Sequence, residues 1–337
     1  MHNRFNYKVF LSNEMLGLLL KFCAVLLSFM FTIFVTKNFN QITVGIIFQL
    51  QLLIMLGIQF SLLGYDLYLL EAVPRLKESK TNLFNYINRL YIKLIFPSLI
   101  GFILISFLFK EKYLFLLIFF ITYFSYLKFK INISYLISES QINVSRFLEN
   151  IVRPVLYVFF LYIFSISAYF NHIFIALSLL ISVLLLFILS EFYFKKKSHS
   201  SKSNKNESYP KFFDTNIKYY AFIVSSGFLS QFPLIYFSYI DKTNWFAIFT
   251  VNLQIALLIS FFQITTVDFV NKKISSTILT NKISKNNKIY LHKIKFINFI
   301  YTLSSSFFIF FFYEDIMRIF FTVEYIDYSI FSLMVCI

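Results

Sequence analysis

The strongest constraint on the fold is a run of apolar residues long enough to cross a bilayer. Residues 16–35 read LGLLLKFCAVLLSFMFTIFV and contain a single charged side chain, Lys21. A stretch of about 20 apolar residues is the length of one transmembrane helix. The run lacks a small-residue cleavage site, so it predicts a retained span and not a removed signal peptide.

Comparable runs recur along the chain and predict nine spanning helices. The composition agrees, because 58% of the residues are hydrophobic, whereas soluble domains contain roughly 45–50% apolar residues. We therefore predict an all-α polytopic membrane protein. The predicted spans lie near 15–36, 43–64, 92–109, 113–127, 151–169, 171–194, 219–240, 244–270 and 296–313.

The C-terminal residues begin a partial tenth span. Residues 328–337 read YSIFSLMVCI, and ten helical residues cover about 15 Å, half of a bilayer. Six spans precede a basic segment and at least three follow it, a plan typical of transporters built from two six-helix bundles. The expectation is a 6+6 fold of which this chain is a fragment or a truncated product.

Positive charges give the expected orientation. Of the 31 Lys and Arg residues, 25 fall before the first span or in alternate connections, and five fall on the opposite side. Lys and Arg collect in short cytoplasmic loops, so we place the N-terminus in the cytoplasm. The net charge of +15 follows from this topology, and no nucleic-acid partner is needed to explain it.

The same charges divide the chain into expected domains. Residues 1–197 form an N-terminal six-helix bundle, 198–218 a basic cytoplasmic linker, and 219–337 a C-terminal bundle that is apparently truncated. We interpret the basic stretch as a flexible linker that also enforces orientation. The alternative is a patch that binds lipid headgroups or a partner.

Signatures of enzymes and cofactor sites are missing from the sequence. It contains no Walker A motif, and its four histidines have no ligand partner at metal spacing. The two cysteines lie in apolar runs and indicate neither a disulfide framework nor a metal site. We therefore predict a protein that is not an enzyme and needs no cofactor.

Small and polar residues recur every three or four positions in the first span, which places them on one face of a helix. Such a face contacts other helices or water, because lipid would leave its polar groups unpaired. Either helix packing or a cavity wall explains it. The residues are Gly17, Lys21, Ala24, Ser28 and Thr32.

Lys21 itself has two interpretations. It lies roughly 8–9 Å inside the span at ~1.5 Å per residue, and a lysine stem can snorkel that far to the interface or pair with a carboxylate. Alternatively, it lines a cavity that receives an anionic substrate. Other spans also carry polar side chains at depth, among them Gln49, Asn252 and Gln263.

The segment 14–76, EMLGLLLKFCAVLLSFMFTIFVTKNFNQITVGIIFQLQLLIMLGIQFSLLGYDLYLLEAVPRL, resembles the opening of bacterial polysaccharide repeat-unit flippases. These belong to the multidrug/oligosaccharidyl-lipid/polysaccharide exporter superfamily. The positions that carry the resemblance are Gly45, Gly64, Asp66 and Arg75.

The resemblance implies a transporter of the inner membrane that works by alternating access. Its implied cargo is an undecaprenyl-diphosphate-linked oligosaccharide for O-antigen or capsule assembly. Its implied partners are membrane lipids, a polysaccharide polymerase and chain-length proteins. A cationic cavity suits a diphosphate. The expected substrate-binding residues are Lys21, Ser28, Gln49, Asp66, Arg75, Asn252 and Gln263.

Three alternatives remain open. A polytopic polysaccharide polymerase, which is an enzyme, resembles a chain with a large outward loop carrying arginines, whereas the outward loops expected here are short. A cation-coupled small-molecule exporter of the same superfamily needs acidic residues deep in the first bundle, and only Asp66 and Glu71 come near. A purely structural membrane protein is the third.

Overall fold

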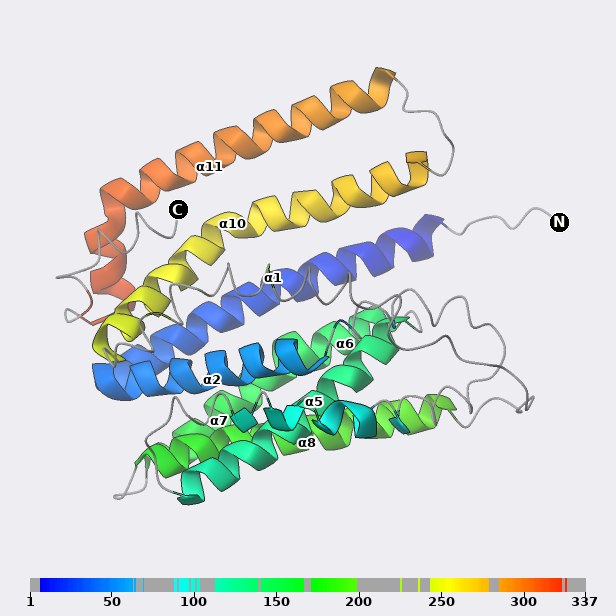
Figure 1. The fold of residues 1–337 in the computed structure, drawn as a ribbon. Coiled ribbons are helices and arrows are strands. Elements are labelled where there is room, and N and C mark those ends of the chain that lie inside the picture. The colour runs from blue at the N-terminus through cyan, green and yellow to red at the C-terminus, as the bar shows by residue number, and fades with distance from the viewer. Residues whose placement is uncertain are drawn as a thin grey trace, which may run out of the picture. The chain divides into compact units, whose positions relative to one another are not determined.

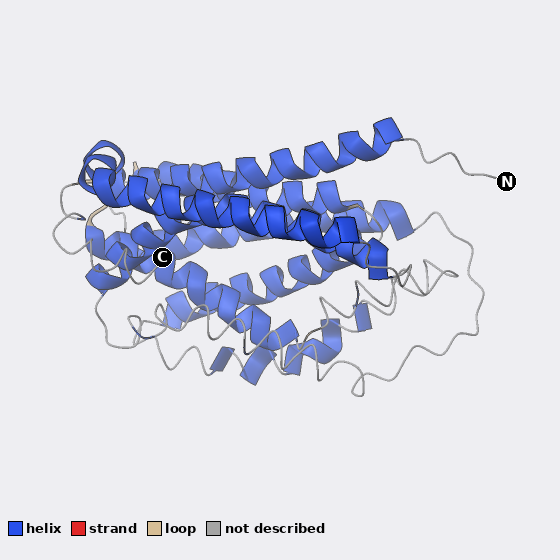
Figure 2. Ribbon diagram, turned by 90° about the horizontal axis from the view of Figure 1, so that it is seen from above, coloured by secondary structure: helices blue, strands red, loops and turns tan. Residues whose placement is uncertain are grey.

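The structure is a computed structural model of the chain, and helices dominate it. The residues that it describes are 7–62, 113–138, 141–166, 171–198, 243–278 and 285–322, with shorter pieces between 64 and 103 and single positions at 225, 236 and 325. Within these residues the regular structure is helical throughout, as Figure 2 shows. The predicted all-α class is confirmed for the described part of the chain.

Among the described residues, six helical segments are long and apolar enough to cross a membrane, as expected of a membrane-embedded protein. A helix satisfies its backbone donors and acceptors internally, which is the condition for entering lipid. The count of nine spans is not confirmed, and the predicted span 219–240 lies almost wholly outside the described residues. The six segments are Leu19–Asn38, Gln41–Leu62, Leu114–Ser138, Ile142–Ser165, His172–Phe194 and Phe296–Phe320.

The predicted ends of two spans are wrong. Helix α5 runs over Tyr113–Ser138, well beyond the expected end at residue 127. The following helical segment begins at Ile142, nine residues before the expected start at 151. Lys128, Lys130 and two arginines therefore lie on helices and not in a connecting loop. The physical reason is that Lys128, Lys130 and Arg153 find partners on neighbouring helical segments.

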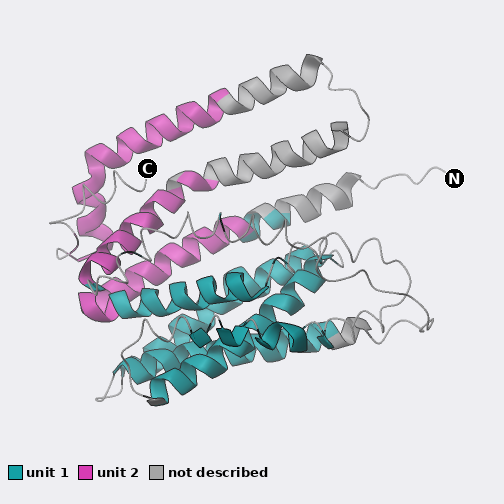
Figure 3. Cartoon of the chain, viewed as in Figure 1, with its two compact units in different colours: residues 1–20, 45–243 teal, residues 21–44, 244–337 magenta. Residues whose placement is uncertain are grey.

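The chain divides into two compact units (Figure 3). Unit 1 comprises residues 1–20 and 45–243, and unit 2 comprises 21–44 and 244–337. Helix α1, Tyr7–Asn38, contributes its first part to unit 1 and its second part to unit 2. The expected bundles 1–197 and 219–337 remain predictions, and linker positions 199–218 lie outside the described residues.

Unit 1 is built around the helices α5, α7 and α8 (Figure 1). Helix α5 packs along α8, and α7 packs on α8 as well. Their shared core is rich in buried aromatic side chains, including Tyr123, Tyr135 and Phe194. The bounds are α2 Gln41–Leu62, α5 Tyr113–Ser138, α6 Ile142–Phe147, the π-turn η1 Leu148–Val152, α7 Arg153–Ser165 and α8 His172–Ser198.

The backbone geometry explains why glycine occupies position 45 in α2 and position 64 just past its end. At Gly45 a Cβ atom would collide with the backbone carbonyl of Thr243, so only glycine permits this approach. Gly64, just past the end of α2, has φ of 79°, a left-handed conformation that glycine adopts without strain. Both positions carry the resemblance noted in the sequence, and here each is explained by backbone geometry.

Unit 2 joins the second part of α1 to α10, Thr243–Ile278, and α11, Lys285–Phe320. Aromatic pairs connect these helices, with ring centroids 5.7 Å apart for Phe22 and Phe261 and 5.4 Å apart for Phe29 and Phe320. The Lys37 ammonium donates to the Ile319 carbonyl at 3.3 Å. A cation at the last turn of α11 complements the helix dipole.

Candidate functional site

A group of charged side chains in the described part of unit 1 lies inside helices that are apolar enough to span a membrane. We define the ionic cluster as five side chains from α5, η1, α7 and α8: Lys128, Lys130, Glu149, Arg153 and Glu191. Charged residues within spanning segments are costly and usually pair with one another. The contacts of the cluster follow that rule.

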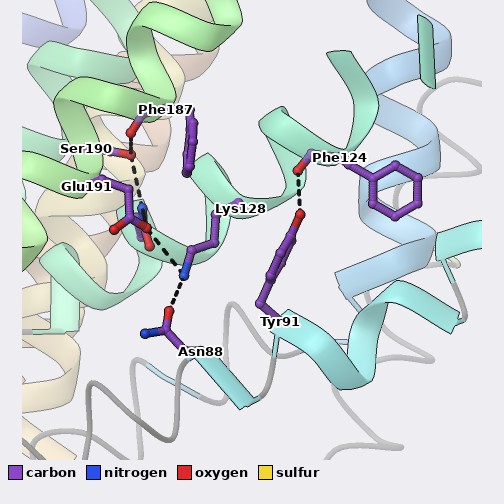
Figure 4. Close-up of polar contacts among 8 residues, drawn as sticks. Asn88, Tyr91, Phe124, Lys128, Phe187, Ser190 and Glu191 are labelled. Carbon is purple, nitrogen blue, oxygen red and sulfur yellow. Dashed lines mark hydrogen bonds and ion pairs between the residues drawn. The ribbon is translucent and has the colours of Figure 1, made fainter. Parts of the chain in front are cut away.

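Lys128 forms the first half of the ionic cluster (Figure 4). Its ammonium donates to the Asn88 Oδ1 at 2.6 Å and lies 3.4 Å from the Glu191 Oε1. Only 8% of the Lys128 side chain and 17% of the Glu191 side chain are exposed. The burial makes this pair far more sensitive to loss of one partner than a surface salt bridge.

Asn132 binds the same oxygen of the Glu191 carboxylate as Lys128. Its Nδ2 donates to Glu191 Oε1 at 3.0 Å and to the Ser190 hydroxyl at 3.1 Å. Asn132 lies one turn after Lys128 on α5 and is fully buried. Residues four apart share one helix face, so α5 presents an ammonium and an amide together to one carboxylate of α8.

Aromatic rings enclose the Lys128 ammonium. It lies 5.4 Å from the ring centroid of Tyr91 and 5.5 Å from that of Phe194. The Tyr91 hydroxyl donates to the Phe124 carbonyl at 3.4 Å, which fixes the ring beside α5 (Figure 4). Such cation–π contacts stabilise a desolvated cation by up to about 2 kcal/mol.

The second half of the ionic cluster centres on Tyr126. Lys130 pairs with Glu149, and the Arg153 guanidinium donates to the Tyr126 hydroxyl. The Lys130 ammonium and the Arg153 guanidinium each lie 5.8 Å from the Tyr126 ring centroid. Glu149 also interacts electrostatically with Arg153. One carboxylate and one ring therefore hold two cations.

A π-turn positions Glu149. The turn η1 spans Leu148–Val152 between α6 and α7, and the Arg153 N–H reaches back to the Leu148 carbonyl. Pro154 follows directly in the first turn of α7 and has no N–H to continue an α-helical ladder. Single π-turns within helices occur often at functional sites. Here the widened turn carries the acidic residue that Lys130 requires.

The sequence-predicted residues within the described part of the chain lie on α1, α2 and α10. Lys21 and Ser28 are half-buried on α1, and Gln49 is half-buried on α2. Asn252 is fully buried on α10. Gln263 also belongs to α10, but its side chain lies outside the described part, as do Asp66 and Arg75.

Two of these residues join helices of unit 2. The Ser28 hydroxyl donates to Gln254 Oε1 at 2.9 Å. Asn252 Oδ1 accepts from the Tyr313 hydroxyl at 2.7 Å. These neutral hydrogen bonds tie α1 to α10 and α10 to α11, which is the contact expected of polar residues within a helix bundle.

Two threonines of α1 are satisfied within their own helix. The Thr32 hydroxyl donates to the Ser28 carbonyl at 3.0 Å, and the Thr36 hydroxyl to the Thr32 carbonyl at 2.9 Å. Both threonines are buried. This arrangement favours helix packing over a cavity wall at these two positions.

The sequence interpretation missed the ionic cluster, because it treated Lys128, Lys130 and Arg153 as loop charges. A signal was present: the text after Lys130 continues as INISYLIS, apolar enough to extend α5. Glu149 and Glu191 supply matching negative charges in neighbouring apolar runs. Opposite charges at depth in adjacent predicted spans predict pairing.

Groups suited to bind a metal ion do not occur among the described residues, where no three His, Cys, Asp or Glu side chains gather. The chain matches no protein-family model, no curated protein and no solved structure.

Proposed function

We propose that this chain is a membrane transporter of the repeat-unit flippase class. It moves an undecaprenyl-diphosphate-linked oligosaccharide from the cytoplasmic to the periplasmic leaflet of the bacterial inner membrane, for O-antigen or capsular polysaccharide assembly. The proposal includes nine spans and a partial tenth from a 6+6 fold, with the N-terminus in the cytoplasm. A polymerase and chain-length proteins use the product.

The observation that carries the proposal is the ionic cluster. Three cations and two carboxylates lie within helices apolar enough to span a membrane. A membrane protein that served only as a scaffold has little use for such groups, because each charge costs several kcal/mol in hydrocarbon. Ionisable residues at this depth mark pathways for polar or charged cargo.

The sign of the charge supports an anionic cargo. The five side chains of the ionic cluster carry a formal net charge of +1, since Lys128, Lys130 and Arg153 outnumber Glu149 and Glu191. A positive interior attracts a diphosphate headgroup and disfavours cationic drugs. This favours a lipid-diphosphate carrier over an exporter of cationic small molecules.

The pairing of the charges supports alternating access. Lys128–Glu191 joins α5 to α8, and Lys130–Glu149 joins α5 to the π-turn. A transporter alternates between two helix packings, and interface ion pairs are contacts that such transitions rearrange. In this proposal the cargo headgroup competes with Glu149 for the cations and loosens the helix contacts.

The test is a translocation assay with the purified chain in vesicles. A fluorescent lipid-diphosphate oligosaccharide is supplied on one side, and its arrival on the other is followed by a membrane-impermeant quencher. We expect translocation above protein-free vesicles and an initial rate lowered about tenfold to a hundredfold in Glu149→Gln, the range for loss of a charge-assisted contact.

Glu314→Gln is the matched control, because Glu314 lies on α11 in an exposed pair with Arg318. Its rate is expected to equal that of the unmodified chain. A rate no higher than in protein-free vesicles contradicts the proposal. Growth of the oligosaccharide by added sugars in the same assay identifies a polymerase instead.

A further inference from the structure

Helix α11 is interrupted near its C-terminal end, where its direction changes (Figure 1). Phe312 has φ of −104° and ψ of 15°, outside the range of an α-helix. Sharp bends in helices usually occur at proline or glycine, and the segment 307–320 contains neither. The contacts on the two sides of Phe312 differ, and this difference supplies a cause for the bend.

The part of α11 after the interruption is anchored to two other helices. Tyr313 and Met317, four residues apart on one face, are buried. The Tyr313 hydroxyl donates to Asn252 Oδ1 of α10 at 2.7 Å. The Lys37 ammonium of α1 donates to the Ile319 carbonyl at 3.3 Å. Directional bonds from both α1 and α10 therefore fix this part.

The part before the interruption, residues 296–311, is held differently. Its exposed side chains are apolar with the exception of Ser304, and Ile309 is its one buried residue. Every half-buried side chain in this segment is polar. Because the half-buried residues recur at helical spacing, they form one polar face opposite the apolar one. They are Asn298, Tyr301, Thr302, Ser305 and Ser306.

A polar face of this kind separates from its neighbours at low cost. The Thr302 hydroxyl donates to the Asn298 carbonyl at 2.8 Å and the Ser305 hydroxyl to the Tyr301 carbonyl at 2.6 Å, so these bonds move with the helix. Water solvates hydroxyl groups that leave a helix contact, whereas an apolar face loses its burial. The opposite, apolar face remains in lipid during such a movement and does not resist it.

We propose that Phe312 is a hinge between a fixed and a movable part of α11. Residues 313–320 stay on α1 and α10, while residues 296–311 swing relative to α10 and open their polar face to water. Hinges of this type are a few residues that absorb the change in φ and ψ between two arrangements. The motion belongs to one helix of unit 2 and does not depend on the cargo of the proposed transporter.

The test compares two distances by double electron–electron resonance in the full chain in nanodiscs, with both native cysteines replaced by serine. One spin label at the exposed Leu257 of α10 is the common reference, and the second is placed at the exposed Ile297 or Asp315 of α11. Ile297 lies about 22 Å from the hinge, so a rotation of about 20° displaces it by about 8 Å. We expect the Leu257–Ile297 distances to spread over at least that range and the Leu257–Asp315 distances to form one narrow peak.

Thiol modification provides an independent measurement of the polar face. A water-soluble methanethiosulfonate reacts with thiolates, which form in water and not in lipid. Ser305→Cys on the polar face is expected to react at least about tenfold faster than Phe299→Cys, the control on the exposed apolar face. Equal widths at the two label pairs overturn the hinge, because α11 is then rigid or moves as a whole. A Ser305→Cys rate no higher than that of Phe299→Cys overturns the opening to water.

Discussion

The two units hold their helices together by different chemistry. In unit 1, ion pairs and cation–π contacts connect α5 to the π-turn and to α8. In unit 2, neutral hydrogen bonds, aromatic pairs and one bond from the Lys37 ammonium to a backbone carbonyl connect α1, α10 and α11. Both units are drawn from similarly apolar sequence, so hydropathy alone does not reveal the difference.

The difference implies unequal sensitivity to substitution. Loss of one member of a buried ion pair leaves an uncompensated charge and costs about 3–5 kcal/mol. Loss of a neutral hydrogen bond between membrane helices costs about 0.6 kcal/mol on average. Unit 1 is therefore expected to lose more stability when one charged partner is removed than unit 2 loses with a single neutral contact. The following three substitutions test this contrast.

The largest effect is expected at Glu149. Glu149→Leu leaves the Lys130 ammonium without its carboxylate and lowers the free energy of unfolding by about 3–5 kcal/mol. Unfolding of the purified protein in mixed micelles, followed by circular dichroism, measures the change. The double variant with Lys130→Met is expected to recover most of the loss, because no unpaired charge remains at that pair. A double variant as unstable as Glu149→Leu contradicts the ion-pair assignment.

A smaller effect is expected in unit 2 at Tyr313. Tyr313→Phe keeps the buried ring but removes the hydrogen bond to Asn252 Oδ1, at a cost of about 1–2 kcal/mol. The same unfolding measurement applies. Tyr193→Phe on α8 serves as the control, because Tyr193 is exposed. Equal stability of the two variants shows that the Tyr313–Asn252 bond does not stabilise unit 2.

The smallest effect is expected at Ser28. Ser28→Ala removes the hydrogen bond to Gln254 between α1 and α10, which costs about 0.6 kcal/mol. Ser260→Ala is the comparison, since the Ser260 hydroxyl bonds the Leu257 carbonyl within its own helix. If Ser28→Ala lowers the free energy of unfolding as much as Glu149→Leu does, the two units do not differ in their sensitivity to substitution.

Hydropathy was sufficient to predict the helical class and the positions of most described spans. It failed at the end of α5, because a hydropathy scale penalises Lys128 and Lys130 as if each were unpaired. Their partners, Glu191 and Glu149, come from other helices. Pairing lowers the cost of burying charge, and a linear sequence does not state which charges meet.

The candidate site was predictable only in part. Polarity within apolar runs drew attention to Ser28 and Asn252, whose role in substrate binding stays a prediction. Their partners Gln254 and Tyr313 lie 226 and 61 residues away in the sequence. Thr32, the next residue of the stripe after Ser28, shows a second limit: a polar residue in an apolar run does not always contact another helix. Its hydroxyl is satisfied by the preceding turn.

The π-turn also changes how the arginines of its span are distributed around the helix. Arg146 and Arg153 are seven residues apart, and in an uninterrupted α-helix that spacing places two side chains in one vertical row. The extra residue of the turn shifts the phase of the helix by roughly one position, about 100°. A helical wheel drawn through 142–165 with a constant step of about 100° therefore places the residues at one end on the wrong face of the helix. The phase shift explains how two arginines of one span can serve different neighbours, Arg146 beside Gly17 and Arg153 at Tyr126.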